Sequence, residues 1–133
     1  MKNLRNTHLL EAAARAVVSS NSLNMIGIAR EIVDQPAPGY YVDYSRAIRC
    51  LKLYQCNKLP VNLSVQKRRM WTEIFQRMED TIKRHPRLTC KQALARVLCE
   101  GGASSFFIEP QSAARIMRQN LKLLKYNLNK MAI

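Results

Sequence analysis

Apolar residues recur with the period of an α-helix along much of the chain. In residues 64–85 they fall at i, i+3, i+4, i+7 and i+11, namely at Trp71, Ile74, Phe75, Met78 and Ile82. This spacing puts them on one face of a helix, and Pro86 favours an end of that helix at His85. The pattern predicts one long helix over 64–85 and another over about 7–19.

A capping box marks the start of a third helix. Thr89 precedes Gln92 by three positions, so that each side chain can bond the backbone N–H of the other residue. We expect a helix from Cys90 to about Glu100.

One sequence pattern occurs twice in the chain. Residues 28–51 align with residues 94–117 without a gap, and thirteen of the twenty-four positions are identical or conservatively replaced. The identical positions are Ala29/Ala95, Arg30/Arg96, Ala37/Ala103, Ala47/Ala113 and Arg49/Arg115. We interpret the two segments as copies of one supersecondary unit.

Each copy has the same order of signals. A helical stretch ends near Asp34 or Glu100, breaker residues follow, and a short aromatic and β-branched run comes next, "YYV" or "FFI". Asp43 or Glu109 then stands at the N-cap of a second helix, and Pro110 suits a first helical position. The aromatic runs are either two short paired strands or extended loops.

These patterns predict a mostly α fold. We expect one compact helical domain over residues 1–133, built from two pseudo-repeated units. Each unit is a helix, a loop or short strand, and a second helix, and the two short segments either pair as a small two-stranded sheet or stay unpaired. The segment 57–64, "NKLPVNLS", is the only plausible internal linker. With 133 residues, 47% of them apolar, the chain is long enough to build a core.

Other sequence features argue against several functions. The four cysteines are spaced C-x5-C and C-x8-C, and the two histidines are isolated, so we expect free thiols and no metal or cofactor. No Gly-rich phosphate loop or recognisable catalytic order of Cys, Ser and His occurs, which argues against an enzyme. No long apolar run or signal-peptide core is present, so we expect a cytoplasmic protein with no membrane partner.

The charge is the strongest functional signal. Twenty-two Lys and Arg against nine Asp and Glu give a formal net charge of +13. Such an excess favours a polyanionic partner, and we expect nucleic acid, DNA before RNA.

Not every cation is available for this role. Glu73, Glu79 and Asp80 each precede a basic residue by four, which predicts a solvated face with ion pairs to Arg77, Lys83 and Arg84. Arg30 and Arg96 are likewise expected to pair with Asp34 and Glu100, four positions on.

Eight other basic residues are the candidate nucleic-acid contacts. Four of them, spaced 3, 4 and 3 on a predicted C-terminal helix without acidic residues, would form a stripe beside an apolar stripe: Arg115, Arg118, Lys122 and Lys125. Alternatively, these side chains only extend past the core to reach water. Lys67, Arg68 and Arg69 stand where the helix dipole disfavours positive charge, which suggests a use in anion contact. Arg49 is the repeat equivalent of Arg115.

Two function classes follow, and a helix-turn-helix is a weak variant of the first. The favoured hypothesis is a basic protein that contacts the phosphate backbone with limited sequence specificity. In the helix-turn-helix variant, "KQALARVLCE" precedes a recognition helix "PQSAARIMRQNLKLLK", although the connection is too long for the usual turn.

The run "QPAPGYYVDYSRAIR" resembles a motif of small proteins from Bacteroidales bacteria and their phages. The resemblance covers about 25 residues of the first copy, more weakly those of the second, and implies no activity for any residue. It implies only a phage or mobile-element origin. The second class is a structural or packaged component of a phage particle, in which the twin units present related surfaces to neighbouring subunits and the basic face meets DNA or other subunits. Such a protein would assemble with copies or partners and be located in the virion.

Overall fold

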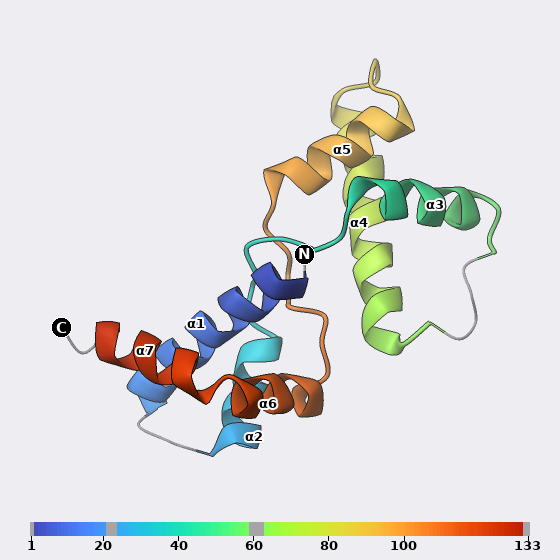
Figure 1. Cartoon of the computed structure of the whole chain (residues 1–133). Helices are drawn as coiled ribbons and strands as arrows, with labels where there is room; N and C mark the ends of the chain where they lie inside the picture. The colour runs from blue at the N-terminus through green and yellow to red at the C-terminus, as the bar shows by residue number, and fades with distance from the viewer. Residues whose placement is uncertain (1, 21–23, 59–62, 132–133) are drawn as a thin grey trace. The chain divides into compact units, whose positions relative to one another are not determined.

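The computed structural model describes residues 2–20, 24–58 and 63–131, and within these ranges the chain is mostly helical and has no strand (Figure 1). Its helices are α1 (Lys2–Ser20), α2 (Met25–Val33), α3 (Tyr44–Gln55), α4 (Val65–Arg84), α5 (Cys90–Glu100), α6 (Pro110–Gln119) and α7 (Leu121–Met131). The mostly α fold is confirmed. Residues 59–62 of the predicted linker 57–64 lie outside the described residues.

The predicted helix boundaries agree closely with those of α4 and α5. Ser64 caps α4 by accepting a hydrogen bond from the backbone N–H of Lys67, and both bonds of the capping box at Thr89 are present. Helix α1 begins at Lys2, earlier than the hydrophobic pattern indicated.

The internal repeat extends beyond the aligned segments 28–51 and 94–117. An offset of 66 residues places α4 on α1, α5 on α2 and α6 on α3. Each copy is therefore a set of three helices, and α7 follows the second set.

The described residues form two compact units that exchange their third helices. Unit 1 comprises Met1–Pro38 and Ala103–Ile133, and unit 2 comprises Gly39–Gly102. In unit 1, α6 of the second copy packs against α2 of the first, while in unit 2, α3 of the first copy packs against α5 of the second. The prediction of a single domain over residues 1–133 stays a prediction.

Unit 1 has a core of small and branched side chains. Helix α1 contributes Leu9, Leu10 and a run of buried alanines, and it packs against α2, α6 and α7. Alanines let neighbouring helices approach closely, and burying the larger side chains such as Ile32 and Met117 supplies the hydrophobic stabilisation.

The two connectors meet at equivalent positions of the repeat. The backbone N–H of Ala37 donates to the carbonyl of Ala103 over 3.0 Å, and the N–H of Ala103 donates to the carbonyl of Ala37 over 2.8 Å. This single antiparallel bridge takes the place of the predicted small sheet. It lies three residues before the aromatic runs.

The aromatic runs themselves are not strands. Tyr41 and Phe107, which are also equivalent in the repeat, have φ angles of 56° and 53°. A left-handed residue interrupts an extended strand, so each run turns the chain before the next helix instead of pairing. Asp43 then caps α3 through its side chain, whereas Glu109 at α6 makes no such bond.

Unit 2 is organised around the apolar face predicted for α4. Trp71, Ile74, Phe75 and Met78 are buried, and Ile82 is half-buried. The rings of Trp71 and Phe75 stack with centroids 5.7 Å apart, and the Tyr54 ring lies 4.6 Å from that of Phe75.

The predicted solvated face of α4 is partly an internal network of unit 2, which corrects the sequence interpretation. Nη1 of Arg77 donates to the Tyr40 hydroxyl over 2.8 Å and to the Gly102 carbonyl over 2.6 Å, and its guanidinium lies 5.5 Å from the Tyr40 ring centroid. The Tyr40 hydroxyl donates to Glu73, and that of Tyr54 to Glu79. These carboxylates face aromatic hydroxyls because the connector and α3 cover this side of α4.

Only one of the two repeat-related ion pairs forms. Nε of Arg96 lies 3.1 Å from Glu100, as predicted. Arg30 and Asp34 are both exposed, and within the described ranges they make no ion pair.

Candidate nucleic-acid interface

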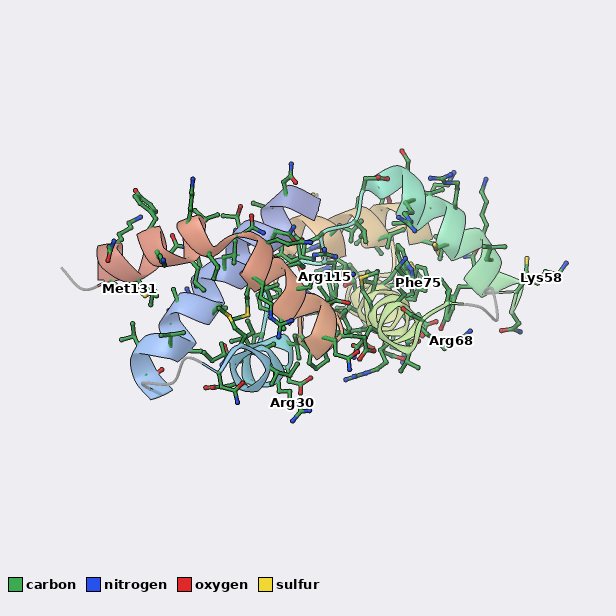
Figure 2. The ribbon with its side chains drawn as sticks, turned by 60° about the horizontal axis from the view of Figure 1, so that its bottom comes forward. Arg30, Lys58, Arg68, Phe75, Arg115 and Met131 are labelled. Atoms are coloured by element: carbon green, nitrogen blue, oxygen red, sulfur yellow. The ribbon has the colours of Figure 1, made fainter. Side chains whose placement is uncertain are left out.

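All eight predicted contact residues are exposed, and they fall into two sets of four. Unit 1 holds Arg115 and Arg118 on α6 with Lys122 and Lys125 on α7. Unit 2 holds Arg49 on α3 with Lys67, Arg68 and Arg69 near the start of α4. One residue of each set, Arg115 and Arg68, is labelled in Figure 2.

The predicted C-terminal helix is broken, so the four-residue stripe does not run along one helix. Helix α6 ends at Gln119, and the side-chain amide of Asn120 donates to the Ile116 carbonyl over 2.8 Å. Helix α7 begins at Leu121, and the backbone N–H of Leu124 donates to the Asn120 carbonyl. Asparagine favours this break because its side chain competes for backbone groups.

The break also changes the predicted apolar stripe. Met117 and Leu124 are buried and Leu128 is half-buried, but Leu121 is 42% and Met131 39% exposed. The basic side chains of α6 and α7 are exposed. Exposure is expected both for phosphate contacts and for side chains that only extend past the core to reach water, so both interpretations stay predictions.

Three helices of the described chain carry cations without any carboxylate. Helices α3, α6 and α7 contain no Asp or Glu, and they contain eight exposed basic residues: Arg46, Arg49, Lys52, Arg115, Arg118, Lys122, Lys125 and Lys130. We call these three the acid-free helices. Their exposed cations have no carboxylate on the same helix to offset them.

Sequence reasoning missed two of these residues on α3. Arg46 and Lys52 flank Arg49 at i−3 and i+3, and Lys52 is the repeat equivalent of Arg118. The same three-residue spacing that identified Arg115 and Arg118 would have identified them.

The helix-turn-helix interpretation is wrong in the form predicted. Its two helices, α5 and α6, belong to different units, because the chain leaves unit 2 after Gly102. The helix that packs against α6 is α2.

One hollow in unit 1 brings a predicted residue together with residues from another helix. It has a volume of about 410 Å³ and is lined by Arg5, Asn6, Ile108, Ser112, Arg115, Ile116 and Gln119. We call it the α1/α6 hollow. Nε and Nη2 of Arg5 both donate to Oδ1 of Asn6, over 3.3 and 3.2 Å. None of the lining residues is acidic.

The four cysteines differ in their exposure. All four are free; Cys50 and Cys90 are half-buried, and Cys56 and Cys99 are exposed. Burial raises the pKa of the Cys50 thiol despite the opposing effect of Arg46 and Arg49. Within the described ranges no group of three or more His, Cys, Asp and Glu residues could hold a metal ion. Among the described helices none is long and apolar enough to cross a bilayer.

Comparison of the chain with protein-family models, with curated proteins and with solved structures gave no match.

Proposed function

We propose that the protein binds nucleic acid, in particular DNA, by contacting the phosphate backbone with limited sequence specificity. The observation that supports this most is the set of eight exposed cations on the acid-free helices α3, α6 and α7. Each cation that neutralises a phosphate releases condensed counterions, which makes binding favourable and salt-dependent.

Both units carry the charge that such binding needs. Unit 2 has thirteen Lys and Arg against five Asp and Glu, and unit 1 has nine against four. Part of the acidic charge is directed inward, since Glu73 and Glu79 accept hydrogen bonds from tyrosine hydroxyls. An excess of one sign on both units attracts a polyanion over long range.

The exposed side chains favour phosphate recognition over base recognition. Lysine and arginine bind the phosphates of any sequence, so the cations of the acid-free helices need no base contact to hold a duplex. The two helices of the predicted helix-turn-helix, α5 and α6, belong to different units, which gives no support to a recognition helix at α6. Limited sequence specificity is therefore expected.

Titration of two unrelated duplexes of equal length tests the proposal. Fluorescence anisotropy from about 50 to 300 mM salt should give similar affinities for both duplexes and a steep decrease of affinity with salt. A marked preference for one duplex, or binding that salt does not weaken, would contradict it.

The particle-component hypothesis makes a different prediction. A protein whose basic face meets neighbouring subunits should sediment with virions and stay there after nuclease treatment. A nucleic-acid binder should elute from heparin with salt and be released when the nucleic acid is digested.

A further inference from the structure

The two copies of the repeat differ at a position that is buried in unit 2 and half-buried in unit 1. The offset of 66 residues places Arg5 on Trp71 and Leu9 on Phe75. In unit 2, Trp71 is buried and stacks on Phe75. In unit 1 the corresponding side chain is a half-buried arginine that lines the α1/α6 hollow. A core aromatic residue is thus replaced by a cation beside an open volume.

From this difference we propose that the α1/α6 hollow binds the 5′-phosphate of a nucleotide, held between Arg5 and Arg115. This inference rests on the proposed function, because the ligand belongs to the same class. It differs in that one phosphate binds in one pocket, whereas the proposed function involves contacts with several phosphates along a nucleic-acid backbone.

The chemistry of the walls suits a phosphate monoester. Arg5 of α1 and Arg115 of α6 line the same hollow, and the arginine guanidinium binds phosphate oxygens in a bidentate manner. A phosphate monoester carries a charge of about −1.5 to −2 near neutral pH, which two guanidinium groups match. Ser112 and Gln119 add a hydroxyl and an amide as further hydrogen-bonding groups.

The two arginines are suited to the task in different ways. The side chain of Arg5 is oriented by its two bonds to Asn6, so less conformational entropy is lost when it binds a ligand. Arg115 is exposed, and in the described part of the chain no carboxylate lies within ion-pair distance of it. Anions can therefore approach it without displacing an acidic partner.

The size and the apolar part of the wall favour a nucleotide over a bare phosphate ion. The volume of about 410 Å³ lies within the range of small-molecule sites, roughly 300 to 1,000 Å³. Ile108 and Ile116 are buried residues that contribute apolar surface to the hollow, against which a sugar or base can pack.

Calorimetric titration with three ligands tests this assignment: deoxyadenosine 5′-monophosphate, and a short single-stranded oligonucleotide with and without a 5′-phosphate. We expect saturable binding of the mononucleotide, of the phosphorylated strand, or of both, and these arms distinguish a free nucleotide from a strand end. If the hollow takes a strand end, the strand without the 5′-phosphate should bind at least about tenfold more weakly than the phosphorylated one.

Four variants separate the hollow from general charge effects. Arg5→Gln and Arg115→Gln should each weaken binding at least about tenfold, because each removes one guanidinium from the walls. Arg30→Gln removes the same charge from unit 1 outside the hollow and should change nothing; Figure 2 shows Arg30 projecting from α2. Ser112→Met fills the hollow without changing the charge and should abolish binding.

Three results would overturn the proposal: no saturable binding of any 5′-phosphorylated ligand, equal binding of the two strands together with no binding of the mononucleotide, or an equal effect of Arg30→Gln. Unaltered binding by Ser112→Met would do so as well, and this variant keeps the test valid if Arg5→Gln does not fold. Long-duplex binding measured on the same proteins is a separate readout. If it persists without hollow binding, only this inference fails; if it is absent too, the proposed function fails with it.

Discussion

The hydroxyl of Tyr40 accepts a hydrogen bond from Arg77 and donates its own proton to Glu73, each over 2.8 Å. Tyr40 lies on the connector that enters unit 2, and Arg77 and Glu73 lie on α4. The same guanidinium binds the carbonyls of Gly101 and Gly102, where the chain leaves unit 2. One arginine therefore fastens both connectors to α4.

Removing that arginine should destabilise unit 2 strongly. Arg77→Met keeps much of the aliphatic side chain but leaves the Gly102 carbonyl and the Tyr40 hydroxyl without their donor. We expect a decrease of about 2 to 3 kcal/mol in the free energy of unfolding, measured by urea denaturation. Arg84→Met, an exposed change on the same helix, should cost less than about 0.5 kcal/mol. Equal effects of the two substitutions would show that the network adds no stability.

The stability contributed by Tyr40 should depend on pH. Burial raises the pKa of Tyr40 from 10.0 to about 12, with Glu73 adding to the rise and Arg77 opposing it. The folded protein thus holds the phenol proton more tightly than the unfolded chain. This contribution is fully present below pH 10 and is lost as the pH rises through about 12.

Tyr40→Phe isolates this effect, and phenylalanine is the residue that the second copy carries at the equivalent Phe106. At neutral pH the variant should be about 1 kcal/mol less stable than the wild type. That difference should shrink between pH 10 and 12, since the titration of the other tyrosines cancels in the comparison. A difference that stays constant over this range would mean that the Tyr40 proton is not coupled to folding.

The two equivalent N-caps should respond differently to the same change. Asp43 accepts a hydrogen bond from the N–H of Arg46 over 2.8 Å, while Glu109 makes no side-chain cap bond. Asp43→Ala should therefore cost about 1 kcal/mol, and Glu109→Ala less than about 0.5 kcal/mol. Thermal unfolding of both variants compares the positions directly. A larger cost at Glu109 would contradict the capping geometry.

Local signals predicted the elements of the fold well. The apolar period in α4, the capping box at Thr89 and the acidic residue at Asp43 each act within a few residues, so the sequence contains the whole signal. The repeat, found from residues 28–51 and 94–117, is also visible in the structure, because the equivalent residues Ala37 and Ala103 form a backbone bridge with each other.

What the sequence did not reveal depends mostly on contacts between distant residues. The exchange of third helices is invisible locally, because α6 has the same apolar face whichever copy of the second helix it packs against. Likewise Arg77 has an ordinary i−4 acid in Glu73, and only the approach of Tyr40 and of the connector makes it a half-buried residue of a hydrogen-bond network. The break at Asn120 differs from these, because its signal is local and the continuous apolar pattern concealed it.

For the candidate interface, the structure agrees with the predicted exposure of the residues but not with their predicted arrangement. Exposure of Arg115, Arg118, Lys122 and Lys125 agreed with the prediction, whereas their single-helix alignment did not. Arg5 could not be identified, because its place in the α1/α6 hollow depends on packing between α1 and α6.

The most direct test of the proposed function compares two variants with equal charge. One carries Gln at Arg115, Arg118, Lys122 and Lys125, and the other carries Gln at four exposed cations outside the acid-free helices, namely Arg30, Lys83, Arg84 and Lys91. The quantity measured is the slope of log K for duplex binding against log salt. We predict that the first variant has a slope shallower by up to about 0.9 for each phosphate that it no longer neutralises, while the second stays close to the wild type. Equal slopes for the two variants would contradict the assignment of phosphate binding to α6 and α7.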